Sequence, residues 1–185
     1  IMKIEYYTWW EFPSALMNAI LKQSMLLIAS GSPSAITKAY SDLLIVQRQV
    51  SAKRRELVDD VKLSDTSTIL EIQTATLFHD IPEPLGFREE DLYLQLGKCE
   101  KAFGHITEAV QYFTISAMLN SKNNNIGGIH EALHDRALAH MTESDIESAV
   151  DDMNRILQEN PNRMLTWGIR ALMYQNLGDC QETIS

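Results

Sequence analysis

The chain has 185 residues, of which 45% are hydrophobic and 22% are charged, and this balance is typical of a folded globular protein. Its formal net charge is −9, and a surplus of acidic residues repels phosphate backbones, which disfavours nucleic-acid binding. The longest strongly apolar run, residues 25–29, is far too short to cross a bilayer, so we expect no membrane span.

The cysteines and the N-terminal half of the chain bear on its cellular location. Cys99 and Cys180 stand far apart in predicted helices, so no disulfide framework is implied. Residues 15–29 lack the charged flank and the cleavage pattern of a signal peptide. We therefore expect a cytoplasmic, intracellular protein.

Residues 1–63 are predicted to form an N-terminal helical region. Apolar residues recur at helical spacing over residues 13–30 and again from about residue 34 to Leu63, and Gly31-Ser32-Pro33 separate the two runs. We expect either a degenerate first hairpin repeat or a separate helical cap. An aromatic cluster near the start either packs on these helices or forms a docking surface. Its members are Tyr6, Tyr7, Trp9, Trp10 and Phe12.

A basic run, Lys53-Arg54-Arg55, stands near the end of the second predicted helix. Acidic residues follow it within the same helix, beginning with Glu56. Mixed charge of this kind is typical of a solvated helix face, so we favour that interpretation over a nuclear signal.

Residues 64–89 are expected to connect the two halves of the chain. Residues 64–78 are rich in β-branched side chains, but a single strand would have no pairing partner in an otherwise helical protein. We therefore predict a helix there. Pro82, Pro84 and Gly86 cannot continue it, which places the connection at the end of this segment.

A 34-residue repeat is visible in residues 90–185. Its units begin at Glu90, His130 and Met164, and the third is incomplete at Ser185. Small residues recur where two antiparallel helices would pack closely, and large residues recur where neighbouring hairpins would meet. The small positions hold Gly97, Ala109, Ala137, Ala149 and Ala171, and the large positions hold Phe113, Trp167 and Tyr174. On these residues this half of the chain resembles the tetratricopeptide repeat (TPR) family.

The resemblance implies an all-α fold of antiparallel helical hairpins stacked as a TPR-like right-handed superhelix, an α-solenoid. The units would span 90–123, 130–163 and 164–185. Trp167 is then expected in the core, where Trp167→Ala would cost roughly 3 to 5 kcal/mol. The six residues between the first two units, 124–129, are interpreted as a lengthened loop because glycine disfavours a helix interior.

The resemblance also implies a concave groove that binds a partner, so the function it suggests is that of a scaffold or adaptor without a cofactor. The groove positions are Leu94, Lys98, Lys101, His134, Leu138, Leu165, Ile169, Leu172 and Gln175. A clamp for the C-terminal carboxylate of a chaperone tail is not supported. Leu94 and Asp135 stand where that clamp needs lysine and asparagine.

The charge and the apolar end of this groove indicate the kind of partner. Residues 90–185 carry 14 acidic and 7 basic residues, so we expect a protein or peptide partner with apolar and basic character. An incomplete last unit leaves two further possibilities open. The apolar end is covered by downstream repeats, or the protein self-associates through it.

One motif offers a different chemistry. Residues 130–134 match the His-Glu-x-x-His pattern, in which His130 and His134 would hold zinc and Glu131 would act as general base. His140 stands at the third histidine of the longer protease motif, but Ala137 replaces the glycine at which that motif turns. In a continuous helix His140 points about 120° away from His134. We therefore predict neither a metal nor an enzyme, and a zinc-dependent hydrolase remains the alternative.

Overall fold

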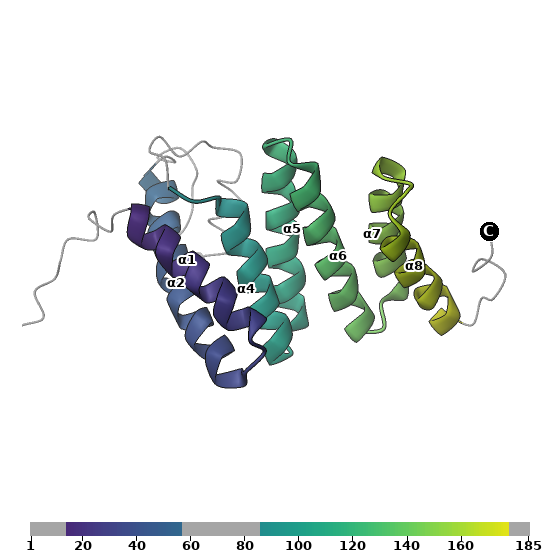
Figure 1. Ribbon diagram of the computed structural model, residues 1–185, viewed down its shortest axis with the longest axis horizontal. Coiled ribbons are helices and arrows are strands. Elements are labelled where there is room, and N and C mark those ends of the chain that lie inside the picture. The colour runs from purple at the N-terminus through teal and green to yellow at the C-terminus, as the bar shows by residue number, and fades with distance from the viewer. Residues whose placement is uncertain (1–13, 57–85, 178–185) are drawn as a thin grey trace, which may run out of the picture. The chain divides into compact units, whose positions relative to one another are not determined.

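The computed structural model describes residues 14–56 and 86–177. These residues form seven α-helices and no strand (Figure 1), which confirms the predicted all-α class for this part of the chain. The chain divides into two compact units, residues 1–95 and 96–185. Several predictions lie outside the described residues: the helical stretch 57–63, the helix at 64–78, the aromatic cluster from Tyr6 to Phe12, the prolines of the connection and the position of Cys180.

The first unit begins with a helical hairpin. Helix α1, Ser14–Ala29, packs against helix α2, Pro33–Glu56. The turn between them lies at the predicted break, where Gly31 adopts a φ of 70° and the chain re-enters a helix at Pro33. The buried face of α2 follows helical spacing, as expected for a helix that covers a core. Its apolar members are Ala39, Leu43, Val46 and Val50.

A buried ion pair joins the end of α2 to the start of α4, Glu89–Phe103. Arg54 is only 2% exposed, and its Nε and Nη2 atoms donate to the two carboxylate oxygens of Glu89 at 2.9 and 2.6 Å. The Tyr93 hydroxyl donates to the same carboxylate at 3.1 Å. The predicted solvated face at residues 53–55 is therefore wrong for Arg54. A buried guanidinium is tolerated because a carboxylate accepts two of its hydrogen bonds.

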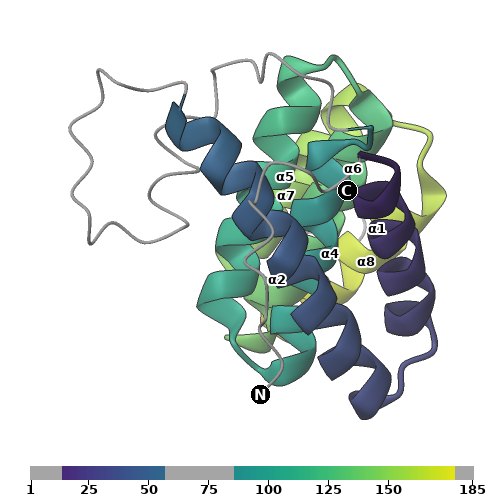
Figure 2. The ribbon, with the colours of Figure 1, turned by 90° about the vertical axis from the view of Figure 1, so that its left-hand side faces the viewer.

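The second unit consists of helices that each pack against the next one along the chain. Its helices after α4 are α5, Ile106–Lys122; α6, Ile126–Thr142; α7, Ile146–Glu159; and α8, Met164–Leu177. Helix α5 packs on α6, α6 on α7, and α7 on α8. Within this unit α6 and α8 lie on one side and α5 and α7 on the other (Figures 1 and 2).

The small and large positions of the first two repeat units lie in the core as predicted, whereas Ala171 and Tyr174 of the third unit are half-buried. Ala109, Ala137 and Ala149 are fully buried, and so is Phe113. A Cβ atom on Gly97 would lie 2.6 Å from the ring of Phe113, so the ring occupies the space that the missing side chain leaves. Glycine at this position allows α4 and α5 to approach closely.

Trp167 does not take the core position predicted for it. Its side chain is 38% exposed, and its Nε1 donates to the carbonyl oxygen of Pro161 at 2.7 Å. The guanidinium of Arg170 lies 4.2 Å from the centre of the indole ring. The ring is thus held by a hydrogen bond and a cation–π contact on the surface, so the cost predicted for Trp167→Ala is too large.

Three successive interhelical turns share one backbone conformation. In each, a residue with positive φ follows the helix, and the next amide donates to the carbonyl five residues earlier. The positive-φ residues are Gly104, Asn124 and Ser144, with φ of 85°, 53° and 62°. The closing hydrogen bonds run from His105 to Glu100, Asn125 to Asn120, and Asp145 to His140, at 2.9, 2.8 and 3.0 Å. This repeated turn gives α4–α5, α5–α6 and α6–α7 the same short connection.

The interpretation of residues 124–129 as a lengthened loop is wrong, because α6 already begins at Ile126. The side chain of Asn125 caps the helix by accepting a hydrogen bond from the amide of Gly128 at 3.4 Å. A Cβ atom on Gly128 would collide with the amide group of Asn120 on α5. Glycine in this first turn is therefore required by close helix packing, and the extra residues lengthen α6 instead of the loop.

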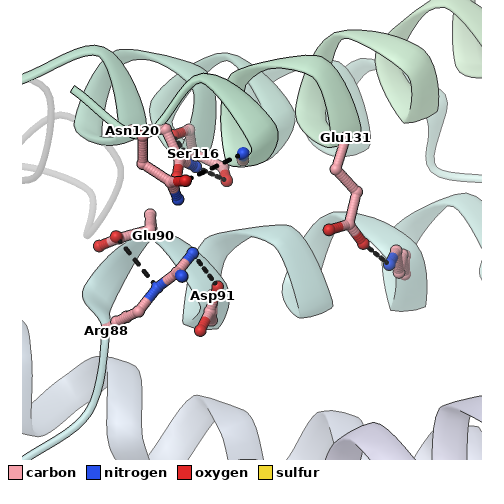
Figure 3. A network of polar contacts seen from close by, with 9 residues as sticks. Arg88, Glu90, Asp91, Ser116, Asn120 and Glu131 are labelled. Atoms are coloured by element: carbon pink, nitrogen blue, oxygen red, sulfur yellow. Dashed lines mark hydrogen bonds and ion pairs between the residues drawn. The ribbon is translucent and has the colours of Figure 1, made fainter. Parts of the chain in front are cut away.

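The asparagine on α5 is itself fixed by a local network. Asn120 donates from Nδ2 to the carbonyl oxygen of Ser116 at 2.9 Å (Figure 3), and its Oδ1 accepts from Asn125 Nδ2 at 2.5 Å. Both ends of the Asn120 amide are thus satisfied. The start of α6 is tied to α5 by side chains as well as by the turn.

The shared turn predicts opposite effects for two matched substitutions. Ser144→Gly should stabilise the protein by about 0.5 to 1 kcal/mol, because it relieves positive φ at a residue with a side chain. Gly104→Ala should destabilise it by about 1 kcal/mol although the space around Gly104 is open. Urea denaturation followed by circular dichroism measures both. A Gly104→Ala protein as stable as the unsubstituted chain would contradict this account of the turns.

Candidate functional site

The predicted groove positions fall into three groups in the structure. Leu94 is buried, at 4% exposure, and is therefore not available as a binding surface. Three polar residues, Lys98 and Lys101 on α4 and His134 on α6, gather around Asp135. The third group lies on α6 and α8, where Leu138 and Ile169 are half-buried and Leu165, Leu172 and Gln175 are exposed.

The polar group is a network of ion pairs between α4 and α6. The Nζ atom of Lys98 lies 2.9 Å from Oε1 of Glu131 (Figure 3) and 3.5 Å from Oδ2 of Asp135. The Nζ atom of Lys101 lies 3.8 Å from Oδ1 of Asp135. Two lysines thus face two carboxylates, so the acidic groups of α6 are largely neutralised within the chain.

The network shifts the pKa values of two of its members. Burial opposes ionisation of Asp135, but the nearby His134 and the charges of Lys98 and Lys101 outweigh it and lower the pKa of this carboxyl group below 3.8. Burial likewise opposes the charge of Lys98. The hydrogen bond to Glu131 and the charge of Asp135 nevertheless raise its pKa above 10.5. Both groups therefore stay charged at neutral pH.

The apolar group is most exposed on α8. The side chains of Met164, Leu165 and Leu172 are 82%, 66% and 58% exposed. Gly168 stands between them along the helix, and a Cβ atom there would meet nothing within 4 Å. We call Met164, Leu165, Gly168 and Leu172 the α8 face. The sequence of α8 contains no aspartate or glutamate, and its one charged residue is Arg170.

Arg170 is engaged away from this face. It contacts the rings of Trp167 and Tyr174, at 4.2 and 5.8 Å from their centroids. Its Nη1 donates to Oδ1 of Asn154 on α7 at 2.9 Å. On an ideal helix Met164, Leu165, Gly168 and Leu172 lie on the side opposite Thr166 and Met173, which are buried. The α8 face therefore consists of apolar residues and contains no charged residue.

Each histidine of the His-Glu-x-x-His pattern has one ring nitrogen near a protein carboxylate, and the buried Nε2 of His134 has no hydrogen-bond partner among the described residues. His130 is buried, and its Nε2 lies 3.0 Å from Oε2 of Glu159 on α7. His134 Nδ1 lies 3.8 Å from Oδ1 of Asp135. The third histidine, His140, has its Nδ1 3.2 Å from Oδ2 of Asp145.

The same segment lacks the bend that the longer protease motif requires. Helix α6 runs without interruption from Ile126 to Thr142. Across residues 14–56 and 86–177, no three side chains of histidine, cysteine, aspartate or glutamate gather in a way that could hold a metal ion. The sequence pattern did not reveal Glu159, because the contact is formed by helix packing across 29 residues.

Cys99 is not available as a nucleophile. Its side chain is fully buried, and burial, assisted by the charge of Glu100, raises the pKa of the thiol to about 12. The thiol is therefore protonated at neutral pH.

Sequence reasoning missed Met164, the most exposed of the large apolar side chains on α8. It was treated as the start of a repeat unit and not as part of a surface. The available signal was its place one turn before Gly168, on the same side of the helix as Leu165 and Leu172.

Comparisons of the chain with protein-family models, with curated proteins and with solved structures gave no match. Among the described helices, none combines the length and the apolar character that a membrane span requires.

The polar network predicts a pH dependence of stability. The folded pKa of Asp135 lies below its ordinary value of 3.8, so its contribution is fully present above that pH and is lost as pH falls through the folded pKa. The contribution of Lys98 is present below 10.5 and is lost as pH rises through its raised pKa. Asp135→Asn should therefore cost about 1 kcal/mol near pH 6 and less at low pH. Urea denaturation from pH 3 to pH 7 measures the difference, and an equal cost at both ends would contradict it.

Proposed function

We propose that residues 96–177 belong to a protein-interaction module, an intracellular scaffold or adaptor that binds an apolar helix or peptide on the side formed by α6 and α8. The observation that carries this proposal is the α8 face. Exposed apolar side chains gathered on one helix are typical of interaction surfaces, whereas single exposed apolar residues are common on any protein.

The proposal includes the arrangement that the TPR resemblance implies. Helices α4 and α5 correspond to the unit 90–123, α6 and α7 to the unit 130–163, and α8 to the first helix of the third unit. The proposed stack is a right-handed α-solenoid whose concave side carries the groove positions. The buried small residues of the first two units support it, and so do the turns at Gly104 and Ser144, because each recurs at the same position in both units.

The partner that best fits this surface has an apolar face of helical or extended spacing. Gly168 leaves room for a partner backbone to approach between Leu165 and Leu172. The acidic balance of residues 90–185 supports a basic flank on the partner. The carboxylates of Glu131 and Asp135 add little to the attraction for such a flank, since Lys98 and Lys101 already neutralise them.

The zinc-dependent hydrolase is set aside in this proposal. His130 faces Glu159 and Glu131 faces Lys98, so the two groups that would bind zinc and activate water already have other partners. A hydrolase would require both contacts to break.

The α8 face is tested by charge substitutions at its two exposed leucines. Leu165→Glu combined with Leu172→Glu should lower partner recovery from the protein's own cell extract about tenfold or more, because docking would bury unpaired carboxylates. Both side chains are exposed, so helicity measured by circular dichroism should not change. Quantitative mass spectrometry of the captured proteins gives the readout.

A matched control is available on another helix. Leu26 on α1 is 74% exposed, and Leu26→Glu should leave recovery unchanged. Undiminished recovery by the double variant would rule out the α8 face as the binding surface.

A further inference from the structure

The methionines of the described residues differ sharply in exposure. Met164 is 82% exposed, whereas Met17, Met153 and Met173 are buried. Met25, at 40%, has about half the exposure of Met164. Met118 and Met141 are half-buried. Methionine sulfur reacts with peroxides when it is accessible, so Met164 is expected to react fastest among the described methionines.

We propose that Met164 is an oxidation site that regulates the α8 face, an inference that rests on the function proposed above. The oxidant is hydrogen peroxide or an organic peroxide. One peroxide oxygen is transferred to Sδ of Met164, so that a sulfur–oxygen bond forms and the oxygen–oxygen bond breaks. The thioether loses two electrons and becomes a sulfoxide, and the peroxide is reduced to water or an alcohol.

Oxidation of Met164 would change the α8 face because of where this residue lies. It is the first residue of α8, it neighbours Leu165, and it lies one helical turn from Gly168. A sulfoxide places a polar oxygen in a face that otherwise presents apolar groups. A docked partner would have to bury that oxygen without a hydrogen bond, which weakens binding.

The structure also indicates that the modification leaves the fold intact. Met164 protrudes from the helix, and its side chain contributes little buried surface. The buried Met153 and Met173 belong to the core and are shielded from the oxidant in the folded chain. The sulfoxide is chemically reversible by methionine sulfoxide reduction, so the site is suited to a reversible change of the surface.

The first experiment measures where oxidation occurs. The full chain is treated with limiting hydrogen peroxide, and sulfoxide is quantified by peptide mass spectrometry. Met164 should be oxidised about tenfold faster than Met153 and Met173, while the circular dichroism spectrum stays unchanged. An oxidation rate at Met164 equal to that at Met153 would overturn the assignment.

The second experiment measures the effect on the surface with the probe 8-anilinonaphthalene-1-sulfonate. Oxidation of the unsubstituted chain should reduce the fluorescence of this apolar dye by about half, and Met164→Leu treated in the same way should retain it. Unchanged fluorescence in the oxidised chain would overturn the regulatory role. Both readouts use the protein without a partner, so their failure is distinct from failure of the capture experiment.

Discussion

The second unit depends on one half-buried guanidinium that contacts three helices. Arg136 on α6 donates from Nε and Nη2 to the two oxygens of Asp152 on α7, at 2.8 and 2.5 Å, and from Nη1 to the hydroxyl of Thr114 on α5 at 2.9 Å. Asp152 is buried, so removing the Arg136 side chain would leave a buried carboxylate without its partner, at a cost of about 3 to 5 kcal/mol. Because α8 packs on α7, this contact also supports the helix that carries the α8 face.

Much of the helical fold could be predicted from the sequence because local residue patterns indicate where helices and turns form. Apolar spacing and the Gly31 turn located α1 and α2, and the 34-residue repeat located the hairpins. The stretch 124–129 was misjudged because glycine is a poor residue inside a helix, whereas here it serves a first turn that packs against Asn120. Arg54 and Asp152 were not foreseen as buried. Their partners lie 35 and 16 residues away, and such pairs form only when helices meet. The sequence did contain one signal for the burial of Asp152, since this residue stands within the apolar stripe of α7.

The candidate site follows the same division between local pattern and tertiary contact. The repeat register identified Leu165 and Leu172, and both are exposed. It could not show that Lys98 and Lys101 neutralise the carboxylates of α6, because those pairs join two helices. Among the predicted groove positions, we therefore assign partner binding to the apolar α8 face and not to the charged residues of α4 and α6. Hydrophobic contact and close backbone approach are the forces that such a face supplies.

The coupling of α5, α6 and α7 through Arg136 is the claim on which the position of α8 depends. Amide hydrogen exchange of the full chain, compared between Asp152→Ala and the neighbouring Asp151→Ala, tests it directly, since Asp151 is exposed and Asp152 is buried. We expect faster exchange in α5, α6 and α7 together when Asp152 is replaced, and no change when Asp151 is replaced. Faster exchange confined to α7 would contradict it.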